Sequence, residues 1–171
     1  MQINVKHDLK ANVSAEQIWA LIGEQFDSVG QWASGVASSS GKQRGSSING
    51  SKFTGRTCQT DIGAVDETIT EYNPGTFSVG YKAIASGMPF FVKQLNNRWK
   101  ITPLGESSCQ VSMHLVVDLA PIIGHLMAPL MKMQLTKLTG ESVEELIYFA
   151  TTGQIHVRKV KAQQKLMAKA A

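Results

Sequence analysis

Cysteine is scarce in this sequence, and long apolar runs are missing. The two cysteines, Cys58 and Cys109, cannot form a disulfide framework, so we interpret them as free thiols. The longest uncharged stretch of apolar character, 119–131, is shorter than the roughly 18 residues that a membrane-spanning helix needs. The first residues also lack the apolar segment of a secretory signal. Together these absences predict a cytoplasmic protein.

Sequence motifs for metals, cofactors and nucleophilic catalysis are missing as well. The 4 histidines form no His-x-x-His or His-Glu-x-x-His pattern, so no metal site is predicted. Neither a Gly-x-Ser-x-Gly sequence nor a glycine-rich phosphate-binding loop occurs. We therefore predict no cofactor and no complete catalytic constellation.

Positive charge is concentrated at one end of the chain. Of the 17 basic residues, five follow Gln154, whereas all 13 acidic residues precede it, so the formal net charge of +4 reflects the tail. A nucleic-acid-binding domain would spread basic residues over a folded face, and no nucleic-acid partner is predicted. The basic tail, 154–171, is expected to be either an extended helix or disordered. Its thin apolar stripe would permit weak contact with an anionic membrane.

Apolar residues make up 43% of the 171 residues, which is typical of one globular domain, here assigned to 1–153. Alternating polarity in 2–11 predicts a first strand. Ser14 and Gln17 match a capping box at the start of a short helix that ends near Gly23. A second short helix or turn is expected over 26–32, interrupted at Gly30. Further strands are predicted near 36–40, 52–61, 64–72, 76–86, 90–102 and 108–119.

After Pro121 the apolar period changes from that of a strand to that of a helix. One broad face predicts a helix of about 28 residues that ends at Gly153 and packs on the sheet; it holds Met127, Met131, Leu135, Leu138, Ser142, Leu146 and Phe149. Strands and helices that are segregated along the chain indicate the α+β class. Because a sheet with one apolar face must be covered, the long helix is expected to cover it.

The order of these elements resembles the START-like, or SRPBCC, superfamily, which includes polyketide cyclases and lipid-transfer proteins. The resemblance rests on an ordered set of segments rather than on one motif: 14–22, Phe26, Trp32, 55–58, 65–74, 77–79, Met88-Pro89, 98–103 and Ala120-Pro121. It implies a helix-grip fold, in which a curved antiparallel sheet of six to seven strands wraps around the long C-terminal helix. Two short helices would follow the first strand, and an apolar cavity would lie between sheet and helix.

If this resemblance holds, strand alternation selects the residues that face the cavity. The ligand-binding set expected from the resemblance and the alternation comprises Trp32, Glu67, Phe77, Tyr81, Met88, Phe91, Trp99, Met113, Met131, Leu135 and Leu138. Asn97 is a polar exception on the same face. Glu67 and Tyr81 would orient the ligand, and Met88-Pro89 would lie in a turn at the cavity mouth.

Glu67 is the most informative of these residues, because an inward carboxylate is costly unless it is paired or neutralised. The resemblance places it where related receptors carry a glutamate that meets a polar group of the ligand. Two other interpretations stay open: a buried ion pair with Arg56 or Arg98, and a shift in strand register that exposes Glu67.

The function that follows from the resemblance is binding or transport of a hydrophobic small molecule, such as a lipid or an aromatic or polyketide-like compound. One alternative is a cyclase, aromatase or dehydrase that uses the same cavity, with Arg56, Glu67 and Tyr81 as the candidate acid/base group. The other is a non-catalytic interaction module. The residues favour a carrier over an enzyme, since nothing in the sequence brings a catalytic set together.

Overall fold

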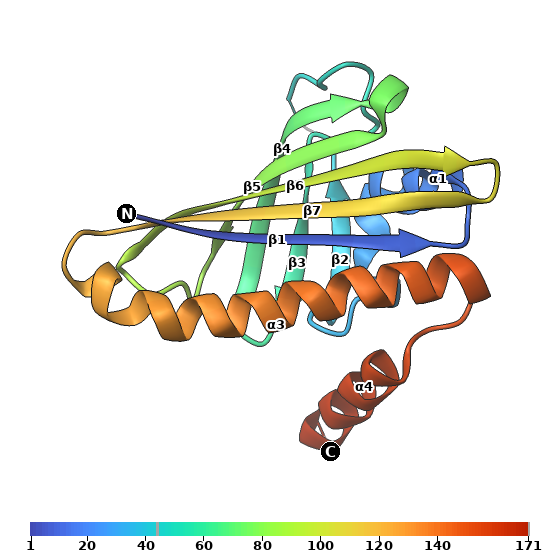
Figure 1. Cartoon of the computed structure of the whole chain (residues 1–171). Helices are drawn as coiled ribbons and strands as arrows, with labels where there is room; N and C mark the ends of the chain where they lie inside the picture. Colours follow the sequence, from blue (N-terminus) through green and yellow to red (C-terminus); the bar gives the residue numbers. More distant parts are fainter. Residues whose placement is uncertain (44, 171) are drawn as a thin grey trace.

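The computed structural model describes residues 1–43 and 45–170, without the side chains of Lys169 and Ala170. Seven antiparallel strands form one sheet in the order β1-β7-β6-β5-β4-β3-β2 (Figure 1). The strands are β1 Gln2–Ala11, β2 Ser38–Lys42, β3 Gly55–Thr60, β4 Gly63–Asn73, β5 Ser78–Ala85, β6 Val92–Gly105 and β7 Ser108–Leu119. All the predicted strands are present, and the first strand pairs with the last.

Short helical segments follow β1 and cover one end of the sheet. They are α1 Ala15–Trp19, the wider π-helical turn η1 Ala20–Glu24, the 3-10 turn η2 Phe26–Ser28 and α2 Val29–Trp32; a further 3-10 turn, η3 Pro74–Thr76, precedes β5. The capping box is confirmed, since the Ser14 hydroxyl accepts from the Gln17 amide and the Gln17 side chain accepts from the Ser14 amide. The expected break at Gly30 is wrong, because α2 continues through it. Glycine at this position lets the backbone of α2 lie close to β2, because a Cβ at Gly30 would lie 2.8 Å from the Ser39 nitrogen.

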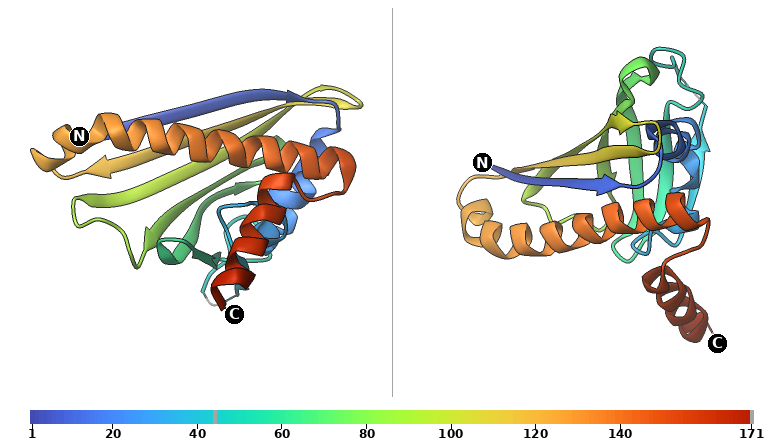
Figure 2. Two further views of the ribbon diagram at one scale, coloured as in Figure 1. Left: turned by 90° about the horizontal axis from the view of Figure 1, so that it is seen from below. Right: turned by 45° about the vertical axis from the view of Figure 1, so that its right-hand side comes forward.

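The long helix, α3, spans Ile123–Thr152 and runs beside β1 and β7 (Figures 1 and 2). It ends as predicted at Gly153, which adopts a left-handed conformation with φ +68°. Leu146 on its predicted inner face is buried, but Leu138 is 50% exposed, so that assignment is wrong. The helix is turned toward β1, where the Thr139 hydroxyl lies 2.9 Å from Nε2 of His7, and this rotation carries Leu138 outward.

The basic tail forms a further helix, α4 Val157–Ala170, which a short non-helical segment separates from α3. Its first cations contact the rest of the fold. Lys159 is 1% exposed and donates from Nζ to the Val36 carbonyl at 2.5 Å. Arg158 donates from Nε to Glu145 at 2.7 Å, and Glu145 also accepts from the backbone and hydroxyl of Ser34. The start of α4 therefore connects α3 with the segment that leads into β2.

The apolar core is divided into two clusters. The first lies under the short helices and the second half of α3, and its large members include Phe26, Trp32, Val79, Tyr81, Trp99, Met113, Val143 and Leu146. The second lies under the first half of α3, and its buried members are Ile3, Val5, Phe91, Val92, Leu115, Val117, Leu119 and Ala128. Ala83, although buried, belongs to neither cluster. The sheet and α3 thus enclose two packed regions rather than one continuous core.

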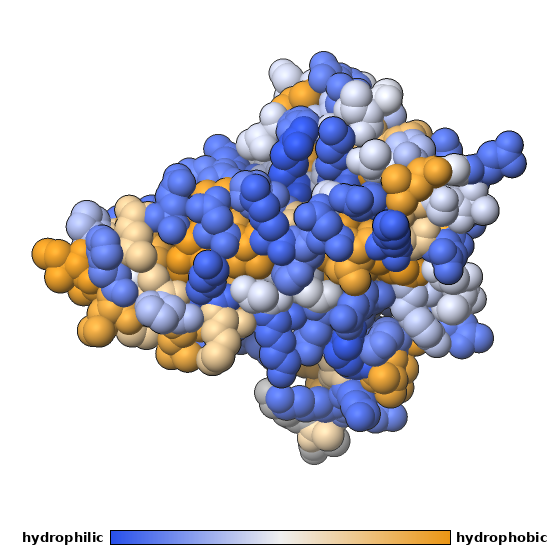
Figure 3. Space-filling view, in the orientation of Figure 1, coloured by the Kyte–Doolittle hydropathy of each residue, from blue (hydrophilic) through white to orange (hydrophobic). Residues whose placement is uncertain are grey.

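Apolar side chains also gather on the outside, at the end of the molecule where α3 begins (Figure 3). Ile122 is 84% exposed, Leu126 81% and Phe90 76%. The Ala120 amide donates to the Phe91 carbonyl at 2.7 Å and holds the β5–β6 loop beside the start of α3. Among the described residues, no helix is both long and apolar enough to cross a bilayer.

Candidate functional site

Four polar side chains cross the inner face of the sheet on adjacent strands; we call Arg56, Glu67, Tyr81 and Asn97 the polar row. Arg56 on β3 lies directly opposite Glu67 on β4, and Tyr81 on β5 lies directly opposite Asn97 on β6. Each of the four residues is at most 9% exposed. The strand register therefore places four buried polar side chains on four adjacent strands, as the alternation predicts for Glu67, Tyr81 and Asn97.

Arg56 and Glu67 form a buried ion pair through Nε and Oε2. Arg56 also donates from Nη1 to the Phe26 carbonyl at 2.6 Å, and its guanidinium lies 4.1 Å from the centre of the Phe26 ring. Burial opposes the charge on Arg56, but the Glu67 carboxylate and other neighbours outweigh it and hold the pKa of Arg56 above its usual value. Of the three interpretations of Glu67, the ion pair with Arg56 is the arrangement present. Arg98 instead pairs with Glu71, which is partly exposed.

Tyr81 and Asn97 meet at the other half of the polar row. The Tyr81 hydroxyl oxygen accepts from Nδ2 of Asn97 at 2.8 Å and from Nε1 of Trp99 at 3.4 Å. Burial first, and the Glu67 charge second, raise the pKa of Tyr81 to about 12, so this phenol keeps its proton at neutral pH. Oδ1 of Asn97 is buried and has no hydrogen-bond partner among the described residues. An unpaired buried carbonyl oxygen costs about 1–3 kcal/mol and calls for a partner.

The predicted ligand-binding residues are distributed over both sides of the polar row. Trp32, Trp99 and Met113 are buried in the first cluster, with Phe77 packed against it; Phe91 is buried in the second, with Met88, Met131 and Leu135 packed against it. Nε1 of Trp32 is, like Oδ1 of Asn97, buried without a hydrogen-bond partner in the described part of the chain. Phe77 precedes β5 in a left-handed conformation and packs on Trp19, with 6.1 Å between ring centres.

Sequence reasoning missed two contributions to the site. Phe26 supplies both a ring face and a carbonyl to Arg56. Asn97 faces inward, but the predicted ligand-binding set does not include it. The signal for Asn97 was its inward position in β6, the same criterion that selected Trp99. Nothing in the sequence indicates that the Phe26 carbonyl faces β3, since this depends on how η2 packs on the sheet.

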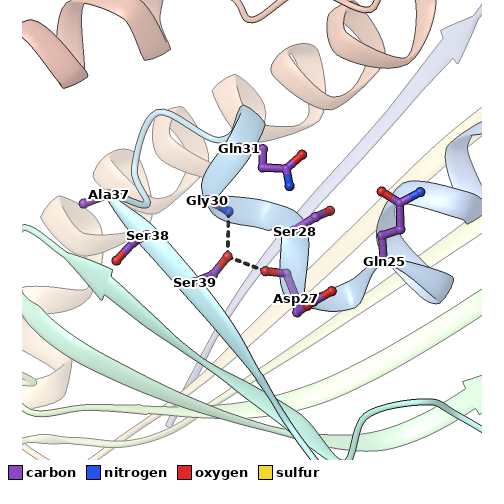
Figure 4. Close-up of a pocket in the computed structure, with 8 residues that line it drawn as sticks. All are labelled: Gln25, Asp27, Ser28, Gly30, Gln31, Ala37, Ser38 and Ser39. Atoms are coloured by element: carbon purple, nitrogen blue, oxygen red, sulfur yellow. Dashed lines mark hydrogen bonds between the residues drawn. The ribbon is translucent and has the colours of Figure 1, made fainter.

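A surface hollow of about 390 Å³ lies outside this region, between the short helices and β2 (Figure 4). It is lined by Gln25, Asp27, Ser28, Gly30, Gln31, Ala37, Ser38 and Ser39. Ser39 accepts from the Gly30 amide at 2.9 Å and donates to the Asp27 carbonyl at 2.5 Å, so these groups satisfy one another (Figure 4). In the described part of the chain, no cluster of three or more His, Cys, Asp or Glu side chains could hold a metal ion.

Comparison with a family model gives a match over most of the chain. The model describes polyketide cyclase/dehydrase and lipid transport proteins, and it matches residues 2–147. No curated protein matches by sequence.

Solved structures share the fold at low sequence identity. A START superfamily protein from Mycobacterium smegmatis is 19% identical with a TM-score of 0.59, over 89% of this chain and 96% of that one. The Zhui aromatase/cyclase from Streptomyces sp. R1128 is 9% identical with a TM-score of 0.68, over 88% and 94%. A norcoclaurine synthase point mutant from Thalictrum flavum, in complex with a transition-state analogue, is 14% identical with a TM-score of 0.63, over 89% and 98%. At these identities the likeness establishes the helix-grip fold alone.

Proposed function

Since the chain belongs to the polyketide cyclase/dehydrase and lipid transport family, we propose that it binds a hydrophobic small molecule between the sheet and α3. The unpaired Oδ1 of Asn97 carries this proposal. It lies on the polar row at the division between the two apolar clusters, where a bound molecule would contact apolar side chains on both sides. Most pockets for small molecules combine such an apolar lining with a few polar groups.

The ligand would lie against residues from both clusters. Trp32, Trp99 and Met113 would contact it from one side, and Phe91, Met131 and Leu135 from the other. Tyr81 and Asn97 would fix the orientation of the ligand. Glu67 would contribute to this orientation indirectly, through its ion pair with Arg56. The partly buried Met88 would lie at the mouth, in the β5–β6 loop.

A cyclase or dehydrase reaction in the same space is the alternative, and it needs a group that moves a proton near neutral pH. The raised pKa of Tyr81, about 12, keeps its hydroxyl protonated at neutral pH, and Glu67 is ion-paired with Arg56. The protonated Tyr81 and the ion-paired Glu67 therefore favour binding without catalysis. A non-catalytic interaction module is the third candidate, and the exposed apolar residues at the start of α3 support it.

Two further properties belong to this proposal. Both cysteines are buried free thiols, which supports a reducing compartment such as the cytoplasm. On α4 the exposed Lys161 and Lys165 accompany the exposed Leu166 and Met167, which supports weak contact with an anionic membrane. Vesicle co-sedimentation at low and high salt tests this contact, and binding that ignores salt would contradict it.

The binding proposal is tested by native mass spectrometry of the purified protein, with solvent extraction of any adduct. We expect an apolar molecule at one per chain, or an increase in Tm with members of a panel of lipids and aromatic compounds. Absence of both an adduct and any change in Tm would refute the proposal.

Matched variants of β5 locate the binding space. Ala83 is buried on the inner face, whereas its neighbour Ile84 is 59% exposed on the outer face. Ala83→Leu should fill the space and abolish binding with little change in stability, while Ile84→Ala should bind like the wild type. If the interior were solidly packed, Ala83→Leu would instead lower the free energy of unfolding by about 1–3 kcal/mol.

A further inference from the structure

The hydrogen bonds of the Tyr81 hydroxyl group use its oxygen as an acceptor and leave its proton without an acceptor among the described residues. A phenol oxygen has two lone pairs and one proton. Both lone pairs are occupied, because Asn97 Nδ2 and Trp99 Nε1 each donate to this oxygen. Among the described residues no acceptor receives the Tyr81 proton. Tyr81 therefore has a hydrogen-bond donor to offer to a ligand bound beside it.

Asn97 offers a hydrogen-bond acceptor beside this donor. Its Nδ2 donates to the Tyr81 oxygen, and its Oδ1 is buried and unpaired within the described residues 1–43 and 45–170. The two residues face each other across β5 and β6, so the free donor and the free acceptor lie on neighbouring side chains. A ligand group that both accepts and donates one hydrogen bond would satisfy both. A hydroxyl group does so for either orientation of the Asn97 amide.

The charge balance around the polar row argues against an ionised ligand. Arg56 is neutralised by Glu67, and its Nη1 is engaged by the Phe26 carbonyl. The other charged residues buried in the described part of the chain, Glu145 and Lys159, are engaged with Arg158, Ser34 and Val36. A carboxylate or phosphate placed beside Tyr81 would therefore lose its hydration without gaining a free cation.

From this donor, this acceptor and this charge balance, we propose that the ligand is an uncharged apolar molecule whose hydroxyl group lies between Tyr81 and Asn97. The class is an apolar alcohol or a phenol, in preference to a fatty acid or a phosphorylated lipid. This inference rests on the proposed binding function, because it specifies which ligand that site accepts.

The test uses ligands that share a skeleton and differ only in the polar group. Naphthalene, 2-naphthol and 2-naphthoate are titrated into the full-length protein at pH 7, with calorimetry as the readout. The pair 1-decanol and decanoate repeats the comparison on a flexible chain. We expect the hydroxyl compound of each series to bind at least ten-fold more tightly than the carboxylate, and 2-naphthol to bind ten-fold more tightly than naphthalene. The ¹H–¹⁵N signal of the Trp99 indole should shift when the hydroxyl compounds bind.

Variants locate the hydroxyl preference. Asn97→Leu and Tyr81→Phe should each reduce it to less than three-fold while leaving naphthalene binding in place. Asn96→Leu is the matched control, because Asn96 is the same residue type at the next position of β6 and faces the opposite side of the sheet. Tm measurements show that each variant is folded, and Tyr81→Phe carries the test if Asn97→Leu does not fold.

Failure of the inference differs from failure of the binding function. If no adduct co-purifies and neither series binds, the binding function itself is refuted. If naphthalene or a carboxylate binds as tightly as its hydroxyl counterpart, or if the co-purified molecule is charged, only the hydroxyl assignment is overturned.

Discussion

Arg56 and Glu67 form a buried ion pair whose contribution to stability can be measured by removing its members in turn. The side chains are 8% and 11% exposed, so either charge left alone would be poorly hydrated. Removing one partner of such a pair costs about 3–5 kcal/mol of the free energy of unfolding. The two single variants should differ, because each leaves a different environment behind.

Glu67→Gln leaves the guanidinium with the Phe26 carbonyl and with the ring faces of Phe26 and Tyr81. We therefore expect a loss at the low end, about 3 kcal/mol. Arg56→Met leaves the Glu67 carboxylate without a hydrogen-bond donor among the described residues, and the expected loss is about 4–5 kcal/mol. The double variant Arg56→Met, Glu67→Met removes both charges and should be more stable than either single variant.

Urea denaturation followed by circular dichroism gives the four free energies of a double-mutant cycle. Lys42→Gln is the control, because Lys42 on β2 pairs across β3 with Asp66 on β4, at 31% and 59% exposure. This variant should lose at most about 1 kcal/mol. Single variants that each lose less than about 1 kcal/mol and combine additively would refute this reasoning.

Three further predictions concern the core, the tail and the outer face of the sheet. Leu146→Ala should lower the free energy of unfolding by about 2–5 kcal/mol, since Leu146 is 0% exposed; a loss below 1 kcal/mol in urea denaturation would show that its surroundings are not packed. Arg158→Gln should cost about 2 kcal/mol and speed hydrogen exchange over 33–37, because the fully buried Glu145 carboxylate would keep only its bonds to Ser34; unchanged exchange would contradict this. Arg98 hydrogen bonds lower the pKa of Glu71 from 4.5, so this pair stabilises the fold above that pH and the benefit is lost as the pH falls through the lowered pKa. Denaturation of Arg98→Gln should accordingly show a loss of about 0.2–1 kcal/mol at pH 7 that disappears under acid, and a loss that persists at pH 2 would argue against the ion pair.

Local features of this fold could be predicted because neighbours within a few residues decide them. The capping box at Ser14 needs only Gln17, and the helix end at Gly153 needs only a residue that tolerates positive φ. Strand alternation likewise indicated that Tyr81 and Asn97 face inward, which follows from the two-residue period of a strand. The family resemblance, carried by the order of these elements, gave the arrangement of sheet and helix.

Residues far apart in the chain were placed by register and packing, which local patterns do not contain. Glu67 had two candidate arginines, and strand register decided for Arg56 by placing it directly across from Glu67. Leu138 is exposed because α3 packs on β1 and β7 with Thr139, not Leu138, facing His7. Lys159 is buried because α4 returns to the segment before β2, a contact across more than 100 residues.

The sequence by itself determined the class of the fold, the approximate length of the long helix α3 and the inward positions of Tyr81 and Asn97, because each depends on periodicity or on a local cap. Only the tertiary structure decided that the core is divided into two clusters and that Arg56 neutralises Glu67. It also decided that Oδ1 of Asn97 has no hydrogen-bond partner among the residues that the structure describes. Whether a buried atom is hydrogen-bonded depends on every group packed around it rather than on the residues beside it in the chain.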